Sequence, residues 1–440
     1  MRFKSRCAAT AALAMLVMSA PGAAAQTADD LFDDAVLHRI DLYVNSRDWS
    51  QLRAEWEGND YVPANFVWRG QTVWNVGIRS RGTGSRNQNK LGLRVDFNRY
   101  TTGQTFLGLK SIILDNLTQD PSNIRETTAF KVMRQMGIPV SREAHAAVYV
   151  NNAYYGLYAI VEEVDTVALS RWFGESGGNL FEYRWLFYYW FTYLGSDLTA
   201  YAPMFEPRTH EDDTLETLYR PIEDMVRTIN ESWDEEFVEA VSRYLDLSLF
   251  IRQVAIQDFL AEADGLVGGW GLNNTYLYRF ENSSLSQFIL WDADNSFQQV
   301  DYPILLRVDL SVLTRRALGV PELRQLYVDT LEQTAALASE TSGEDPRGWL
   351  EREVARELDL IWTAAHQDRN KPFTNAQFDQ AAADMMRFAQ ARAAFVRCEI
   401  GKLQDPAMAD AVCTPPPPPE TIVTESPERR TRVRRSRIIK

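Results

Sequence analysis

Two carboxylates stand two residues apart at the end of an apolar stretch, in the text FILWDADNSF. Asp292 and Asp294 follow a predicted strand, and residues two apart on an extended chain point to the same side. Hard oxygen ligands of this kind suit Mg²⁺, Mn²⁺ or Ca²⁺. The pattern predicts a divalent-metal site, although an isolated Asp-x-Asp pair is often only a calcium or capping site.

Upstream, Asp264 ends a predicted helix before a glycine-rich loop, and Asn273 and Asn274 open the next strand. An Asp, then an Asn, then an Asp after an intervening hairpin is the order found in kinase active sites. There the first Asp positions the acceptor hydroxyl, and the Asn and the last Asp hold metal on the phosphates.

A glycine turn lies nearer the N-terminus, in the text Arg81-Gly82-Thr83-Gly84-Ser85, and Lys90 follows it into a strand. Backbone amides of such a turn can surround a phosphate, and a strand lysine can neutralise it. Glu126, on the next predicted helix, is placed to pair with that lysine. Each motif alone is weak, since such a turn is most often just a hairpin. Their order along the chain favours phosphoryl transfer.

Residues 36–165 are predicted to form mainly strands. HRIDLYVN, VWNVGIRSRG and KLGLRVDF alternate with period two. A helix should begin with Asp120 as N-cap and Pro121 in its first turn, and end at Gly137. A hairpin should turn at Asn151-Asn152. This region is therefore expected to be a twisted sheet crossed by one helix.

Residues 166–405 are predicted to be mainly helical, with helices near 213–244, 246–262, 309–341, 345–366 and 374–403. A short hairpin, NNTYLYRF with SQFILWDADNSF, interrupts them and carries the metal-site residues. The aromatic-rich segment 185–193 is too short to cross a membrane, and we expect its rings to be packed or partly exposed.

The first 25 residues have the three parts of an export signal. Arg2, Lys4 and Arg6 precede an uncharged apolar stretch, and Ala23-Ala24-Ala25 offers a cleavage site. The stretch is short for an uncleaved anchor. We expect a periplasmic, extracellular or cell-surface protein with a leader at 26–35 and no membrane-spanning segment after cleavage.

The whole chain has 46 basic and 60 acidic residues, a net charge of −14, and loss of the three basic signal residues makes it −17. A nucleic-acid-binding function is therefore not expected.

Cys398 and Cys413 remain after cleavage, as one disulfide, which the compartment favours, or as two free thiols. The segment 414–440 is proline-rich and then basic. It is either a solvated disordered tail or a tether to an anionic surface or to the acidic body.

Several sequence segments resemble the spore-coat protein H (CotH) kinase family of atypical secreted protein kinases. They are GIRSRGTGS…K, GLKSIILDNLTQDPSNIRE, GIPVSREAHAAVYVNNAYYGLYAIVEEVD, GNLFEY, NNTYLY and FILWDADNSF, in this order over about residues 38–300 and less clearly to about 403. The resemblance implies an α+β, atypical protein-kinase-like two-lobed fold, with a twisted antiparallel sheet lobe and a mainly helical lobe. It also implies metal-dependent transfer of the ATP γ-phosphate to protein serine or threonine.

Carried onto this sequence, the resemblance implies that Lys90 contacts the nucleotide phosphates with Glu126 as its partner, and that Asp264 orients the acceptor hydroxyl. Asp292 and either Asn273 or Asn274 would bind Mg²⁺ or Mn²⁺, supported by Asp294. The remaining nucleotide-side residues would be Arg81, Gly82 and Ser85 in the turn, and Glu162 with Glu163 near the strand that links the lobes. The family's glycine turn commonly has Asn-Ser where this chain has Thr83-Gly84. Neither a His-Arg-Asp nor an Asp-Phe-Gly motif occurs in the sequence.

Two other functions remain open. A catalytically weak relative could keep the fold as a surface-binding protein or adhesin, because fold does not fix function. A metal-dependent hydrolase could use the same carboxylates, but it would need a water-activating base and no lysine-bearing glycine turn.

Overall fold

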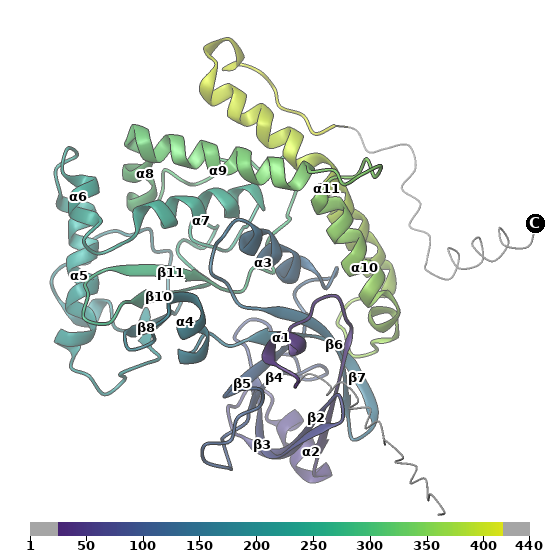
Figure 1. The fold of residues 1–440 in the computed structure, drawn as a ribbon. Helices are drawn as coiled ribbons and strands as arrows, with labels where there is room; N and C mark the ends of the chain where they lie inside the picture. The colour runs from purple at the N-terminus through teal and green to yellow at the C-terminus, as the bar shows by residue number, and fades with distance from the viewer. Residues whose placement is uncertain (1–24, 417–440) are drawn as a thin grey trace, which may run out of the picture.

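The computed structural model describes residues 25–416 (Figure 1). Nearly all of the expected signal peptide and the basic part of the tail therefore lie outside the described residues. Within 25–416, no helix is long and apolar enough to cross a membrane. The structure combines sheets with long helices, which confirms the predicted α+β class.

Seven strands of the N-terminal region close into a barrel in the order β1-β2-β3-β4-β5-β7-β6. They are β1 (His38–Val44), β2 (Val62–Trp68), β3 (Gln71–Arg81), β4 (Gly92–Asp96), β5 (Ser111–Asp115), β6 (Glu143–Val150) and β7 (Ala153–Glu162). Neighbours pair antiparallel except β1 and β6, whose parallel pairing closes the barrel. The expected twisted antiparallel sheet is thus closed into a barrel by one parallel pair, and closure removes the exposed strand edges.

Alternating apolar residues fill the barrel. Phe66, Phe97 and Phe106 meet there with ring centroids 5.3–5.4 Å apart, and all three are buried. Two short helices accompany the barrel, α1 (Ala28–Leu31) and α2 (Ser46–Ala54). At the β6–β7 turn, Asn151 and Asn152 have φ of 49° and 68°, the conformation of a type I′ hairpin. The predicted hairpin is confirmed.

Helix α3 (Arg125–Gln135) lies between the barrel and the layer that holds α7 and α9 (Figure 1). It begins later than predicted, because Asp120 caps a preceding turn: its carboxylate accepts the backbone N–H of Ser122 and that of Arg125, both at 2.8 Å. The helix ends as predicted at Gly137, whose φ is 75°.

A second sheet has the order β11-β10-β8-β9, from β8 (Asn179–Tyr183), β9 (Phe205–Pro207), β10 (Thr275–Arg279) and β11 (Ser286–Leu290). Strands β10 and β11 form the predicted hairpin. The helices around it are α4 (Thr166–Phe173), α5 (Leu215–Glu231), α6 (Phe237–Val241), α7 (Leu247–Phe259), α8 (Val312–Gly319), α9 (Pro321–Ser339), α10 (Trp349–Gln367) and α11 (Asn375–Gln404), with short 3₁₀ turns η1 (Leu198–Ala200) and η2 (Pro406–Met408).

Two expected long helices are each divided in two. The range 213–244 forms α5 and α6, and the range 309–341 forms α8 and α9. Val320 has extended dihedrals and Pro321 begins α9, because a proline fits the first turn of a helix but not its interior.

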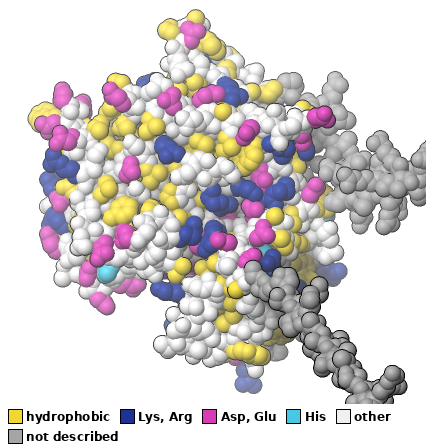
Figure 2. Space-filling view, viewed as in Figure 1, with side chains coloured by type: hydrophobic (Ala, Val, Ile, Leu, Met, Phe, Trp, Pro, Cys, Tyr) yellow, Lys and Arg dark blue, Asp and Glu magenta, His cyan; other side chains and the backbone are white. Residues whose placement is uncertain are grey.

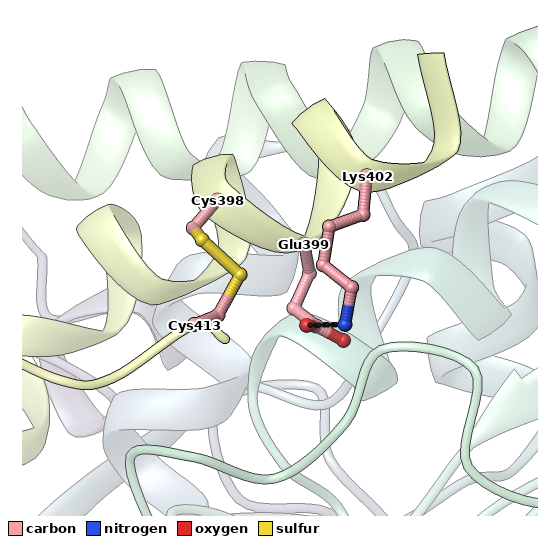
Figure 3. The surroundings of a disulfide bond; sticks show 4 residues. All are labelled: Cys398, Glu399, Lys402 and Cys413. Carbon is pink, nitrogen blue, oxygen red and sulfur yellow. Dashed lines mark hydrogen bonds and ion pairs between the residues drawn. A yellow bond between two sulfur atoms is a disulfide. The ribbon is translucent and has the colours of Figure 1, made fainter. Parts of the chain in front are cut away.

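A disulfide joins Cys398 on α11 to Cys413, with a Cα–Cα separation of 5.7 Å (Figure 3). Beside it, the Lys402 ammonium lies 3.1 Å from the Glu399 carboxylate. The predicted disulfide is confirmed, and it fixes the end of the described chain against the last helix.

Candidate active site

Asp264 lies just beyond the C-terminal end of α7, and both of its carboxylate oxygens accept hydrogen bonds. Asn273 Nδ2 donates to Oδ1 at 2.9 Å and Asn274 Nδ2 donates to Oδ2 at 3.2 Å. Burial raises the pKa of Asp264, and the two asparagine bonds oppose that rise. The structure therefore brings together the predicted acceptor-orienting Asp and both candidate asparagines.

Asp292 follows β11 and lies near this group. Burial raises its pKa to about 6, with further contributions from the Asp115 and Asp264 carboxylates. Asn274 and Asp292 both have positive φ, 47° and 52°, and the Trp291 N–H donates to the Asn274 carbonyl at 3.0 Å. Left-handed backbone at residues other than glycine costs energy and is concentrated at functional sites. The two chain segments are therefore held in specific conformations at the point where the polar side chains meet.

Asp294 belongs to the same acidic group. Burial and the nearby Asp292 raise its pKa well above the usual value, and Asn295 Nδ2 donates to its Oδ1 at 2.9 Å. The side chains of Asp292 and Asp294 are both half-buried. Their negative charges repel, so the pair favours a bound cation or a proton.

Glu262 connects the two loops that carry these residues. Its Oε1 accepts the Asp264 N–H at 2.7 Å, and its Oε2 accepts the Ser296 hydroxyl at 2.6 Å. Burial raises the pKa of Glu262 to about 7. This residue fixes the backbone at Asp264 relative to the loop after Asp292.

The barrel contributes Arg81, the last residue of β3. Its Nη1 lies 3.1 Å from Asp115 Oδ2 at the end of β5. Burial lowers the pKa of Arg81, but the nearby Asp115 and Asp292 carboxylates outweigh this and raise it on balance, with a smaller contribution from Glu126. Arg81 is thus the barrel cation that faces the predicted metal-site carboxylates.

Glu126 lies in the first turn of α3 and is buried. Burial raises its pKa well above the usual value, and the carboxylates of Glu143 and Asp292 raise it further. The glutamate of α3 is therefore close to the acidic residues that follow β11, and its carboxylate contributes to the raised pKa of Arg81 on β3.

Lys90 has an ionic partner that the sequence analysis did not predict. Its Nζ lies 2.7 Å from Asp368 Oδ2, and both side chains are completely buried. The described residues show no ion pair between Lys90 and Glu126. Asp368 also accepts the backbone N–H of Leu157 at 3.0 Å and that of Asn370 at 2.9 Å. Lys90 therefore joins the barrel to the end of α10.

The glycine turn is held in place by Asn116, the residue that follows β5. Asn116 Nδ2 donates to the carbonyls of Ser85 at 2.9 Å and Lys90 at 2.8 Å. Gly82 has φ of 107°, and a Cβ there would lie 2.6 Å from Ser85 Oγ. Only glycine fits this position without a shift, so the turn keeps its backbone close to Ser85.

Glu162 and Glu163 stand at the end of the barrel, where β7 leads to the helices. The Arg142 guanidinium lies 2.6 Å from Glu162, and Arg171 contacts its other carboxylate oxygen. Glu163 pairs with Arg94 at 3.0 Å. Arginines therefore occupy both carboxylate oxygens of Glu162.

A family model described as CotH kinase protein matches residues 78–396. The chain belongs to the CotH kinase protein family. Among curated proteins, it is 24% identical over 309 residues to inner spore coat protein H of Bacillus subtilis (strain 168). That alignment covers 67% of this chain and 80% of the relative. The resemblance drawn from the motifs is confirmed, and the CotH match contains every candidate site residue.

The residues of this CotH chain suit a divalent cation by their chemistry. In addition to burial, the Asp115, Asp292 and Asp294 carboxylates raise the pKa of Glu126, and those of Asp115 and Asp292 raise the pKa of Arg81 beside them. Within residues 25–416 the Asp292 carboxylate accepts no hydrogen bond from another side chain or backbone group. Yet no three His, Cys, Asp or Glu side chains in that range are arranged as a ready metal site. The candidate ligand set therefore needs the asparagine oxygens in addition to Asp292.

Sequence reasoning missed Asp115, Glu262 and Asp368. Asp115 ends the apolar strand SIILD just as Asp292 follows the apolar strand FILW, and that shared pattern could have identified it. Glu262 stands two residues before Asp264, but its bond to Ser296 depends on the fold. Asp368 carries no local signal, because its partner Lys90 is brought to it only by the docking of α10 on the barrel.

Proposed function

We propose that this protein is an exported, metal-dependent protein kinase that transfers the γ-phosphate of ATP to serine or threonine side chains. The observation that carries the proposal is the grouping of Asp264, Asn273, Asn274 and Asp292, with Arg81 facing them from the barrel. In protein kinases, a β3 cation paired with a helix glutamate lies opposite an Asp, an Asn and a second Asp. Family membership supports the same class of reaction.

In this proposal, Asp264 orients the acceptor hydroxyl and takes its proton. Its raised pKa suits that role, because a base works best when its pKa approaches the working pH. The Asn273 and Asn274 amides hold the carboxylate in a fixed orientation. Glu262 fixes the Asp264 backbone from the other side.

Arg81 takes the phosphate-contacting role that the sequence had given to Lys90, and Glu126 is its α3 partner. Lys90 takes a structural role, because its ammonium is buried against Asp368. In this proposal, backbone amides of the turn at Gly82 and Ser85 contact phosphate oxygens. Asp292 and one of the two asparagines would hold Mg²⁺ or Mn²⁺, supported by Asp294, and the ion would neutralise charge on the phosphates.

Export and the lobed arrangement belong to the same proposal. The helical region with its small sheet acts as one lobe and the barrel with α3 as the other. The N-terminal signal pattern supports export, as does similarity to a protein named for the spore coat. The basic tail then lies outside the cytoplasm, where it could contact an anionic surface.

The test is transfer of labelled phosphate from ATP to a generic basic or serine-rich protein, with Mg²⁺ or Mn²⁺. We expect transfer by the mature protein and a loss of at least 100-fold in Asp264→Asn and in Asp292→Asn. The exposed Asp212→Asn change is the matched control and should retain activity. Release of free phosphate without labelled protein would identify a hydrolase instead. Neither transfer nor nucleotide binding with either metal would refute the proposal.

A further inference from the structure

Five apolar side chains form an exposed cluster beside the candidate active site. Trp185, Leu186, Phe187, Tyr188 and Trp270, called the aromatic surface below, are 39%, 51%, 45%, 57% and 48% exposed. Neighbouring exposed apolar residues on a folded protein commonly mark an interaction site. Tyr and Trp are also the residue types that most often anchor bound polypeptides.

The aromatic surface is held in place by its own contacts. Tyr188 stacks on Trp270 with centroids 5.8 Å apart, and Trp185 meets Trp270 edge-on at 5.3 Å. Trp185 Nε1 donates to the Trp270 carbonyl at 2.9 Å. The Leu272 N–H donates to the Tyr189 carbonyl at 2.9 Å, which ties the two segments together. The rings are therefore preorganised, which lowers the entropy cost of binding.

The same loop carries Trp270 and the proposed acceptor-orienting residue. The Gly269 N–H donates to the Ala263 carbonyl at 2.6 Å, and the Asn273 N–H donates to the Gly265 carbonyl at 3.2 Å. The loop thus leaves Asp264, presents Trp270, and returns to Asn273. A ligand on Trp270 is therefore bound to the same loop that carries Asp264, where the acceptor hydroxyl must arrive.

We propose that the aromatic surface binds an apolar side chain of the acceptor polypeptide and so presents a nearby serine or threonine to Asp264. This inference rests on the proposed kinase function and names the substrate feature that it recognises. A polypeptide is the occupant because it is the ligand that must reach Asp264, and the Asp264 loop itself supplies one of the rings. From the aromatic surface, the acceptor polypeptide can then extend to the Asp264 carboxylate.

The test uses a set of serine-centred peptides that differ only in the position of one phenylalanine, with a parent peptide that lacks it. Wild-type protein should phosphorylate the best-placed peptide with about tenfold higher kcat/KM than the parent, which corresponds to ~1.4 kcal/mol. Tyr188→Ser and Trp270→Ser should remove most of this preference through KM for the peptide. An unchanged KM for ATP would show that the nucleotide site of each variant is intact, and an unchanged thermal unfolding temperature would show that its fold is intact.

Trp74→Ser is the matched control, because Trp74 on β3 is 65% exposed and lies outside the aromatic surface. It should keep the preference. Phosphorylation without any phenylalanine preference, or a preference that Tyr188→Ser leaves intact, would overturn the inference and leave the kinase proposal standing.

A second measurement separates the two proposals if wild-type protein phosphorylates nothing. Tryptophan fluorescence then reports peptide binding directly. Peptide binding that depends on the position of the phenylalanine and is lost in Tyr188→Ser would support the aromatic surface as a polypeptide site, although the kinase proposal had failed. Absence of such binding would overturn the inference. Tyr188-dependent pelleting with phosphatidylglycerol vesicles, without peptide binding, would assign a lipid occupant and would also overturn it.

Discussion

Two basic residues near the glycine turn differ completely in their surroundings. Arg81 is a fifth exposed and faces the carboxylates of Asp115 and Asp292. Lys90 is fully buried, and its pKa is lowered by burial, which Asp368 opposes. Breaking a buried ion pair leaves an uncompensated charge and typically costs about 3–5 kcal/mol. The two residues should therefore respond differently to loss of charge.

We predict that Lys90→Met lowers the free energy of unfolding by about 3 kcal/mol, and that adding Asp368→Asn recovers part of this loss. Arg81→Met should instead reduce phosphate transfer at least 100-fold with a smaller effect on stability. Urea unfolding and the transfer assay measure the two effects separately. If Lys90→Met unfolds like wild type but no longer binds ATP, Lys90 is the phosphate-contacting residue after all.

At the scale of elements, the β6–β7 hairpin also fixes the strand that closes the barrel. The Asn151 side chain donates to the Val44 carbonyl and accepts the Val44 N–H, both at 2.9 Å. Its own N–H donates to the Leu42 carbonyl at 2.9 Å. A residue of the turn thus extends the parallel pairing of β1 with β6.

Asn151→Ala should destabilise the protein by ~2 kcal/mol, because it removes two hydrogen bonds and places alanine at φ of 49°. Asn152→Gly should change stability by less than ~0.5 kcal/mol, because glycine accepts positive φ and the lost bond to Tyr43 is exposed. Chemical denaturation of both variants checks this. Equal effects would show that turn conformation, rather than contact with β1, dominates.

At the scale of the whole molecule, α10 holds the barrel and α3 together. Glu357 on α10 accepts the Thr127 hydroxyl at 2.7 Å and the Thr128 hydroxyl at 3.2 Å. At the C-terminal end of α10, Asp368 pairs with Lys90, and a Cβ on Gly156 would lie 2.7 Å from the Asp368 carboxylate. Acidic and basic side chains are mixed over the visible face, with basic ones gathered near the junction of barrel and helices (Figure 2).

Burial raises the pKa of Glu357 from 4.5 to about 7, which makes this junction sensitive to pH. The folded protein holds the Glu357 proton more tightly than the unfolded chain. The corresponding stability is present below pH 4.5 and is lost as pH rises to about 7. Glu357→Gln cannot ionise, so its stability relative to wild type should rise by about 1–3 kcal/mol over this range and then level off. Urea unfolding from pH 4.5 to 8 tests this, and parallel pH curves would contradict it.

Features that depend on near neighbours along the chain are predictable from the amino-acid sequence. Period-two alternation, the Asn151-Asn152 turn and the Gly137 helix end are local. So is the order of Asp264, the asparagines and Asp292, which allowed the family to be recognised. The Cys398–Cys413 disulfide spans a short stretch of chain, so pairing was again a local inference.

Features that join distant segments depend on how the elements pack in three dimensions. The parallel pairing of β1 with β6 closes the expected twisted sheet into a barrel. The docking of α10 took Lys90 into a pair with Asp368, and the end of β3 brought Arg81 to the carboxylates instead. The packing of residues 185–191 against the Asp264 loop likewise left some aromatic rings exposed and buried others. Local patterns fix which face of a strand or helix is apolar, but the partner of each buried charge depends on which elements pack together.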